Sequence, residues 1–488
     1  MARQAELLVG IDVGTTMTKA AVVRTDGEEI SLGSVPTPWR PVPTGAEANP
    51  LDFLEAVARA TSAALELAPP GPVVGVGVTS MAETVVLLGK DGRPTAPAVA
   101  WHDTRGAEEA EELARVFGDA TFSGRTGLPL SPLCTLVKLA WRSSHQGSAA
   151  TRALSVADWV VYSLGGDQVA EASLASRTGA LSLVGRRWWT EALEWATVPV
   201  DLFPPVVQAG ERAGHVTAEA LQLLPGGTAP LGGQLERLRG AALASAGHDH
   251  LCVAAGAGAL RPGELLDSCG SAEGFVRTVP PLDEAALRRV VSSGLSAGWH
   301  TLPDRYALLG GQSLGLLLGP VLKLLGVDDD EGVTNLDRAA AANDASSLRM
   351  LRDGPFASPS IVGLGPDASP PALWAAALDV VSEGAARVVA AMDREAGPAE
   401  ELVLTGGWSH LAGLRDRKGS LLPRARRPAV VEAGARGAAL FGGCAAGLFP
   451  GPGAFPASAD LAWADSPEGD VAPTRREQAR PSATVTQR

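Results

Sequence analysis

The stretch from Leu7 to Val23 reads LLVGIDVGTTMTKAAVV. Its two apolar runs, LLVGI and KAAVV, flank a short polar turn, and this pattern predicts a β-hairpin. Gly14 in the turn gives the backbone freedom to point several amide N–H groups at one anion, and the hydroxyls of Thr15 and Thr16 add donors. Asp12 ends the first run, where a carboxylate can hold a hard cation such as Mg²⁺ on bound phosphates. The turn therefore predicts a phosphate-binding loop, although an ordinary turn between two core strands explains the same residues equally well.

Length and charge set the class of protein. A chain of 488 residues is too long for one ordinary core, so two or three domains are expected. The formal net charge is −13, which argues against broad binding of nucleic acid or anionic membranes, because both require an excess of Lys and Arg. A nucleotide is still compatible with this charge, because a few backbone amides and one metal ion can hold its phosphates.

The apolar segments and the cysteines indicate a cytoplasmic protein. Glu6 and Asp12 interrupt the first apolar segment, so it does not form the core of a signal peptide. The uncharged run of residues 307–322 contains four glycines and Pro320 and is too short to span a bilayer. The four cysteines lie far apart without a CxxC pair, which is typical of reduced thiols.

The region from residue 51 to 106 predicts a helix followed by strands whose ends carry polar residues. Residues 51–67 are amphipathic, a strand follows Pro72, and Asp91-Gly92 predicts a hairpin turn between TVVLLG and APAVAW. Strand ends expose residues to ligands, although ordinary polarity at strand ends is an equally good explanation. The candidates are Ser80, Met81, Glu83, Trp101, His102 and Asp103. Further along, the small and polar segment 173–183 is better explained by packing than by function.

The second informative stretch, AGHDHLCVAAGAGAL, places Asp249 before a helix of small residues. A carboxylate there lies at the positive end of the helix dipole, which favours its ionised form. Asp249 is therefore a candidate general base, and a simple N-cap is the alternative.

Two further turns extend the pattern. The run LLDSCGSAEG repeats the chemistry of the first turn, with Gly270 and Ser271 as loop residues, and two such loops suggest two similar halves facing each other. ELVLTGGWSH ends a strand at Gly406 and Gly407, where backbone could lie flat against a base or ribose. Residues 430–447 form a helix of small residues, and residues 451–488 are expected to be mostly a flexible tail.

With DVGTTMTK, AGHDH, DSCGSAEG and TGGW in this order, the chain resembles the FGGY family of carbohydrate kinases over roughly residues 7–449. The resemblance implies an α/β fold of two ribonuclease-H-like (actin-like ATPase) domains with a catalytic cleft between them. We place these domains at residues 1–246 and 247–450, with residues 451–488 as the tail. It also implies ATP-dependent phosphorylation of a hydroxyl of a small sugar or polyol, with ATP and Mg²⁺ as cofactors.

The family's functional residues map onto this chain by position. Asp249 matches the catalytic aspartate, and Mg²⁺ would lie near Asp12. The implied ATP and phosphate contacts are Asp12, Gly14, Thr15, Thr16 and nearby Lys19 in the first loop, Gly270 and Ser271 in the second, and Gly406 and Gly407 in the adenosine turn. The implied acceptor contacts are Met81, Ala82, Glu83, Asp249 and His250.

The sequence leaves the acceptor open. Ala82 stands where xylulose kinases have histidine, Glu83 is similar to the glycerol kinases, and AGHD is similar to the fuculose kinases. A ketose of the xylulose or fuculose type and a short polyol are therefore both compatible. The segment after Gly407 departs from the family pattern, so contacts to the nucleotide base are not carried over. The expected partner is the small-molecule substrate, with no nucleic acid and no membrane, and a symmetric homodimer is the common assembly.

Two other functions compete. GQSLG at residues 311–315 matches the serine-hydrolase pattern GxSxG, with Ser313 as nucleophile, Asp379 or Asp393 as acid and His410 as base. A chain with 57 glycines readily gives such a match by chance, and a hydrolase leaves both phosphate loops unexplained. The second alternative is an actin-like ATPase coupled to a protein partner; Asp249 and Glu83 favour the small-molecule kinase over it.

Overall fold

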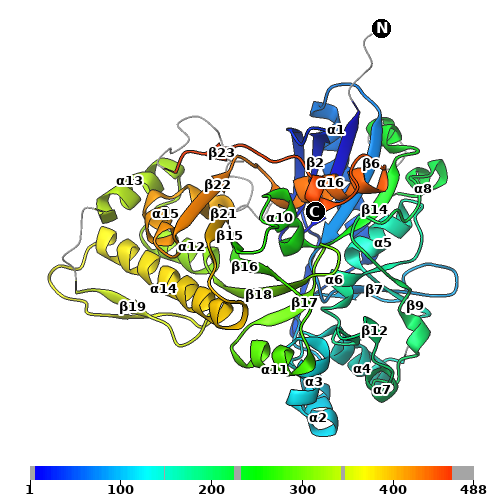
Figure 1. Ribbon diagram of the computed structural model, residues 1–488, viewed down its shortest axis with the longest axis horizontal. Coiled ribbons are helices and arrows are strands. Elements are labelled where there is room, and N and C mark those ends of the chain that lie inside the picture. The colour runs from blue at the N-terminus through cyan, green and yellow to red at the C-terminus, as the bar shows by residue number, and fades with distance from the viewer. Residues whose placement is uncertain (1–5, 148, 225–231, 342–346, 464–488) are drawn as a thin grey trace, which may run out of the picture.

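Two large sheets form the framework of the protein. The computed structural model describes residues 6–147, 149–224, 232–341 and 347–463. The first sheet has the order β14-β6-β1-β2-β3, and the second β17-β18-β16-β15-β21-β22-β23 (Figure 1). The first consists of β1 (Leu7–Val13), β2 (Met17–Arg24), β3 (Glu29–Pro36), β6 (Val73–Ser80) and β14 (Ala242–His248). The second consists of β15 (Glu264–Cys269), β16 (Ala272–Val279), β17 (Ser296–Trp299), β18 (Tyr306–Ser313), β21 (Glu401–Thr405), β22 (Arg424–Pro428) and β23 (Asp460–Leu461).

The two sheets share one topology. In the first, β1 pairs antiparallel with β2 and parallel with β6, and β14 is parallel to β6. In the second, β15 pairs antiparallel with β16 and parallel with β21, and β22 is parallel to β21. The orders β3-β2-β1-β6-β14 and β18-β16-β15-β21-β22 therefore correspond strand by strand, as expected for two similar halves.

Helices cover these sheets, and small sheets extend them. The helices are α1 (Pro50–Leu67), α2 (Ala107–Phe117), α3 (Asp119–Thr126), α4 (Thr135–His145), α5 (Val156–Ser163), α6 (Ala172–Ala175), α7 (Thr190–Trp195), α8 (Ala218–Leu223), α9 (Gly232–Leu235), α10 (Asp249–Gly256), α11 (Glu284–Ser292), α12 (Gly315–Leu324), α13 (Asp330–Ala341), α14 (Pro370–Ala396), α15 (Ala412–Gly419) and α16 (Ala433–Ala445). The small sheets contain β4 (Arg40–Val42), β5 (Gly45–Ala48) and β8 (Ala98–Val99), then the pairs β7 (Val85–Leu88) with β9 (Arg152–Ser155), β10 (Ala170–Glu171) with β13 (Val206–Val207), β11 (Leu181–Ser182) with β12 (Arg187–Trp188), and β19 (Arg349–Leu351) with β20 (Ser360–Val362). None of the helices in the described ranges is both long and apolar enough to cross a membrane.

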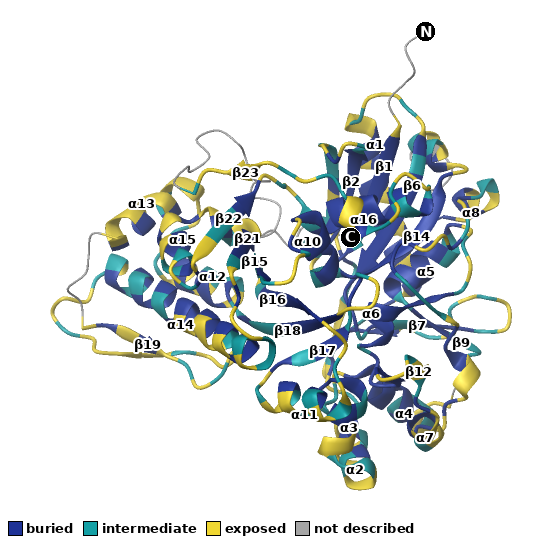
Figure 2. Ribbon diagram, viewed as in Figure 1, coloured by how far each residue is buried: buried dark blue, intermediate teal, exposed yellow. Residues whose placement is uncertain are grey.

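Glycines let α16 pack directly on the first sheet. A Cβ on Gly10 of β1 would lie 1.8 Å from the carbonyl oxygen of Ala435, and one on Gly77 of β6 would lie 1.9 Å from that of Ala438. Neither position has room for a side chain, so the helix backbone rests on the strands, and the central strands are buried (Figure 2).

The structure adds detail to the predicted domains. The boundary at 246/247, which stays a prediction, falls inside β14, and α16 returns to the first sheet. Residues 451–463, which the sequence analysis assigned to the tail, pack instead: Phe455 contacts Phe441, and β23 pairs with β22. The rest of the predicted tail, residues 464–488, lies outside the described residues.

One predicted hairpin forms only in part. The turn at Asp91-Gly92 is present, and an isolated bridge joins Leu88 and Pro94. Beyond that bridge the two segments separate, because β7 pairs with β9 and β8 pairs with β5. The turn was predictable from two residues, whereas the strand partners come from segments elsewhere in the chain.

Candidate active site

The first sheet brings Asp12 and Asp249 together at the carboxyl ends of its parallel strands β1, β6 and β14. Asp12 of β1 lies opposite Thr79 of β6, and Thr79 lies opposite Gly247 of β14. The Thr79 hydroxyl donates to the Gly247 carbonyl at 2.6 Å. Asp249 begins α10 two residues later, so the two carboxylates predicted from separate motifs belong to one site.

Asp12 has the properties of a cation ligand. Its Oδ1 is buried and has no hydrogen-bond partner among the residues that the structure describes. Burial, together with the Asp249 carboxylate and against the opposing effect of Lys19, raises the pKa of Asp12 to about 7. A bound divalent cation would satisfy the unpartnered oxygen and favour the ionised carboxylate, so the residues present fit the predicted Mg²⁺.

The first loop differs from its prediction in one respect. Gly14 does not adopt the left-handed backbone; its N–H donates to the Met17 carbonyl at 3.1 Å, and a Cβ would lie 3.0 Å from that oxygen. Crowding, rather than an unusual φ angle, is therefore the structural reason for this glycine. The Thr15 hydroxyl accepts from the Trp101 indole at 2.9 Å, whereas Thr16 is exposed. Lys19 forms an ion pair with Glu432 at 2.7 Å.

Asp249 is held by its own neighbours and stays accessible. The His250 backbone N–H donates to its Oδ1 at 2.7 Å, and His248 Nε2 lies 3.2 Å from the same oxygen. The side chain is 23% exposed, so a substrate can reach it. Burial raises the pKa of Asp249, while His250 and its backbone N–H act in the opposite direction. Burial also lowers the pKa of His248 well below the usual value, so this imidazole is neutral.

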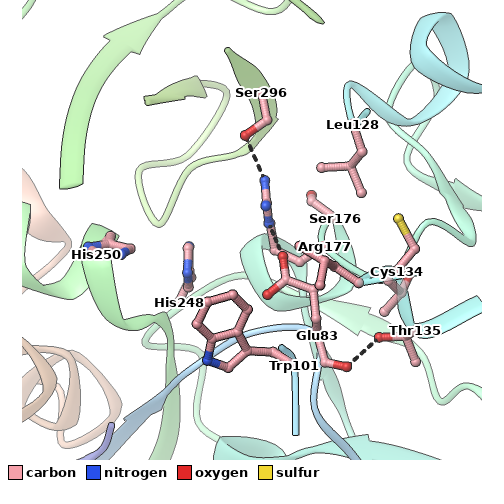
Figure 3. A network of polar contacts seen from close by, with 12 residues as sticks. Glu83, Trp101, Leu128, Cys134, Thr135, Ser176, Arg177, His248, His250 and Ser296 are labelled. Atoms are coloured by element: carbon pink, nitrogen blue, oxygen red, sulfur yellow. Dashed lines mark hydrogen bonds and ion pairs between the residues drawn. The ribbon is translucent and has the colours of Figure 1, made fainter. Parts of the chain in front are cut away.

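Glu83, a predicted acceptor contact, is paired with Arg177. Glu83 has a left-handed backbone with φ of 59°, and its Oε1 accepts from Arg177 Nε at 2.8 Å. Arg177 Nη1 donates to Ser296 of β17 at 2.9 Å, so the arginine bridges both halves of the chain (Figure 3). The Glu83 and Arg177 side chains are 14% and 17% exposed. Of the other predicted contacts, Met81 and Ala82 are buried in the hydrophobic core that packs on the first sheet.

Arg177 was not among the site residues expected from the sequence. It lies in the segment 173–183 that we attributed to packing. Its ion pair with Glu83 spans 94 positions of sequence, and neither residue lies in a recognisable shared motif.

The second loop lies beside the adenosine turn. Ser268 of β15 is opposite Thr405 of β21, which places the predicted Gly270 and Ser271 next to Gly406 and Gly407. Backbone N–H groups of Gly315 and Leu316, at the start of α12, donate to the Gly270 and Ser271 carbonyls at 3.2 and 3.0 Å.

The two glycines of the adenosine turn differ. Gly406 has φ of 90°, and a Cβ would lie 2.6 Å from the Cys269 carbonyl oxygen, so this side of Gly406 faces β15 and not a ligand. Gly407 is exposed, and a Cβ there would meet nothing within 4 Å. Gly407 is therefore the one of the two that leaves open space.

A buried ion cluster lies beneath the second loop. Lys418 of α15 contacts Asp267 at 2.6 Å and also Glu273, and all three side chains are 0% exposed. Cys269 Sγ donates to Asp267 Oδ1, and Gln312 Nε2 donates to Glu273. Asp267, Cys269 and Glu273 could together offer ligand atoms to a metal ion, but the Lys418 ammonium already supplies the cation there.

His250 brings the second sheet to Asp249. A Cβ on Gly274 of β16 would lie 2.6 Å from the imidazole, so the ring lies directly on that strand. In Figure 3, His248 is drawn between His250 and the Glu83 and Arg177 pair.

The residues of the alternative hydrolase have other partners. Asp379 and Asp393 form ion pairs with Arg417 and Arg277, each at 2.7 Å. Ser313 ends β18, where its backbone N–H donates to the Pro355 carbonyl at 2.9 Å. These contacts give the Ser313 hydrolase no support.

Comparisons with known proteins find similarity to carbohydrate kinases. Residues 7–229 match the model of the FGGY family of carbohydrate kinases, N-terminal domain. A xylulose kinase of Streptomyces coelicolor is 29% identical over 470 residues, which cover 91% of this chain and 89% of the relative. A gluconokinase of Bacillus subtilis is 27% identical over 312 residues, which cover 62% of this chain and only 56% of the relative. The crystal structure of a xylulose kinase from Rhodospirillum rubrum is 25% identical, has a TM-score of 0.77 and covers 93% of this chain and 94% of its own. The predicted fold of two ribonuclease-H-like (actin-like ATPase) domains is confirmed.

Proposed function

Because the chain belongs to the FGGY family of carbohydrate kinases, we propose that it transfers the γ-phosphoryl group of ATP to a hydroxyl of a small, uncharged ketose or polyol. One observation carries the proposal: the accessible Asp249 carboxylate lies at the same sheet edge as the buried, unpartnered Asp12 oxygen. A base for the acceptor and a ligand for the nucleotide's cation are two recurring parts of phosphoryl-transfer sites.

Asp249 would act as the general base. Its Oδ1 accepts from the His250 backbone N–H and lies 3.2 Å from His248 Nε2, which fixes the direction of the carboxylate. The acceptor hydroxyl passes its proton to this carboxylate as its oxygen attacks phosphorus. Because His248 is neutral, it leaves the carboxylate free to take that proton.

The nucleotide would lie between the two loops. Asp12 is the residue that would hold Mg²⁺, which when bound neutralises charge on the phosphate oxygens. Thr16 on one side and Ser271 on the other are exposed and can donate to phosphates, and Gly407 leaves room for the adenosine. His250 lies against Gly274, which joins the two halves beside Asp249. Closure of the halves over the substrates would exclude the water that otherwise hydrolyses ATP.

The charges favour an uncharged acceptor. Arg177 is the arginine whose charge acts on Asp249, and Glu83 already neutralises it. A carboxylate on the acceptor would meet Glu83, Asp249 and Asp12 and would be repelled. A diol is different, because a hydroxyl both donates and accepts and can therefore bind Glu83 and Arg177 together. The charges of the site therefore favour a ketose or a polyol over an aldonate, which carries a carboxylate.

Acceptor-stimulated ADP formation tests the proposal. The panel contains ketoses, deoxyketoses and polyols of three to six carbons, with gluconate as the anionic comparison and a reaction without acceptor. We expect strong stimulation by at least one uncharged compound and little by gluconate. A preference for gluconate would contradict the charge argument, and ADP formation that no acceptor changes would favour an ATPase coupled to a protein partner.

A further inference from the structure

The backbone that carries Asp249 leaves its sheet just before that residue. The pairing of β14 with β6 shifts register between Ser245 and Gly247, and Gly247 adopts φ of 93°. His248 then precedes α10 without a side-chain cap. Since the strand ladder is interrupted here, the direction of Asp249 depends on what holds the backbone of Gly247 and His248.

Two hydroxyls hold that backbone from outside the strand. Thr79 donates to the Gly247 carbonyl at 2.6 Å, and the His248 N–H donates to Ser173 Oγ at 2.9 Å. Ser173 lies on α6, more than seventy residues earlier, and is 1% exposed. The segment that we attributed to packing in the sequence therefore reaches the residue adjacent to Asp249.

Glu171 sets the direction of the Ser173 hydroxyl. Ser173 Oγ donates to Glu171 Oε2 at 2.6 Å, and the backbone N–H groups of Ser173 and Leu174 donate to the same oxygen at 2.8 and 3.1 Å. A serine hydroxyl has one proton, and since that proton points at Glu171, a lone pair is left for the His248 N–H. Glu171 is 0% exposed, so water does not compete for these bonds.

Close packing leaves the loop little room to shift. A Cβ on Gly247 would lie 2.5 Å from Ser173 Oγ and 2.9 Å from Glu171 Oε2. Ser173 and Glu171 therefore lie directly against the left-handed Gly247, and Ser173 also accepts the N–H of the neighbouring His248.

We propose that Glu171 and Ser173 are positioning residues for phosphoryl transfer, which fix Gly247 and His248 so that Asp249 meets the acceptor hydroxyl. This inference rests on the proposed role of Asp249 as base. Both residues are buried, with Glu171 0% and Ser173 1% exposed, so each would act through the backbone that it holds. Loss of these hydrogen bonds should therefore lower kcat and leave the KM values for ATP and for the acceptor nearly unchanged.

Kinetic measurements on three variants test this proposal. Ser173→Ala removes the acceptor of the His248 N–H, and we expect kcat to fall about 10- to 100-fold with both KM values within about threefold. Glu171→Gln keeps an oxygen for the Ser173 hydroxyl and should retain kcat within about threefold. Thr126→Val is the matched control, because the buried Thr126 hydroxyl also accepts a backbone N–H, that of Leu128, and donates to the Phe122 carbonyl.

Amide hydrogen exchange gives a readout that does not depend on activity. Ser173→Ala should speed exchange in peptides covering residues 247–250, and Thr126→Val should not. Unchanged exchange in Ser173→Ala would overturn the inference, as would an unchanged kcat in an enzyme whose wild type is active. If no acceptor stimulates the wild type, the proposed function fails. The exchange result alone then decides whether Glu171 and Ser173 hold the backbone of Gly247 and His248.

Discussion

Replacing Lys418 by methionine should destabilise the fold strongly, because it removes the cation from a fully buried cluster. The ammonium contacts Asp267 at 2.6 Å and also Glu273, and no side chain of the three is exposed. Methionine has a similar length and fills the space, so the main loss is charge. Two carboxylates would then face each other without water and without a counter-ion.

The magnitude follows from that burial. Removing one partner of a buried ion pair costs about 3–5 kcal/mol, which is a large part of the roughly 5–15 kcal/mol by which proteins are stable. For a large domain, about 1 kcal/mol corresponds to roughly 2–4 °C in melting temperature, so the expected decrease is roughly 6–20 °C. The proposed second phosphate loop connects the strands of Asp267 and Glu273, so the KM for ATP should rise as well.

Thermal melting and urea unfolding measure the effect. Lys90→Met is the control, because Lys90 is exposed and its loss should change stability by less than about 0.5 kcal/mol. Adding Asp267→Asn and Glu273→Gln to Lys418→Met removes the uncompensated charges and should restore most of the stability. A Lys418→Met protein that melts within about 2 °C of the wild type would refute the reasoning.

Three further outcomes are expected. Asp249→Asn keeps the shape of the side chain but loses the base, so kcat should fall about 10²- to 10⁴-fold while ATP binding, measured by calorimetry, stays nearly unchanged; equal turnover would exclude Asp249 as base. Arg177→Met leaves Glu83 without its partner, so the KM for the acceptor should rise at least about tenfold in initial-rate measurements and that for ATP should not; a rise in both would contradict this assignment. Burial, opposed by hydrogen bonds from Ser173 and Leu174 and supported by Asp158, raises the pKa of Glu171 to about 8 from a usual 4.5. Between these two pKa values the folded protein keeps a proton that the unfolded chain releases. The free energy of unfolding should therefore fall as the pH rises from 4.5 to about 8, by up to about 1.4 kcal/mol per pH unit. The urea midpoint of Glu171→Gln should depend less on pH over this range.

Local patterns predicted what neighbouring residues decide. The two apolar runs around the polar turn at Gly14 predicted the first hairpin, and the small residues of 430–447 predicted a helix, which the structure packs on glycines of the sheet. The repeat of that pattern around Gly270 predicted the second half, whose strands follow the same order. In each case, the forces that form the element act within about twenty residues.

Contacts between distant segments were beyond such patterns. Arg177 meets Glu83 across 94 positions and Ser296 across 119, and His248 meets Ser173 across 75. Single side chains carry these bonds, and in a sequence a serine or an arginine looks the same whether it belongs to a functional site or to the core. The left-handed Glu83 was equally hidden, because glutamate rarely adopts that conformation.

The central claim is that phosphate leaves ATP for a carbohydrate hydroxyl and not for water. Phosphorus NMR of the protein with Mg-ATP and its best acceptor counts both products directly. We predict a new phosphate ester in equal amount to the ADP formed, and little inorganic phosphate. Inorganic phosphate that matches ADP whether or not an acceptor is present would contradict the account and indicate an ATPase.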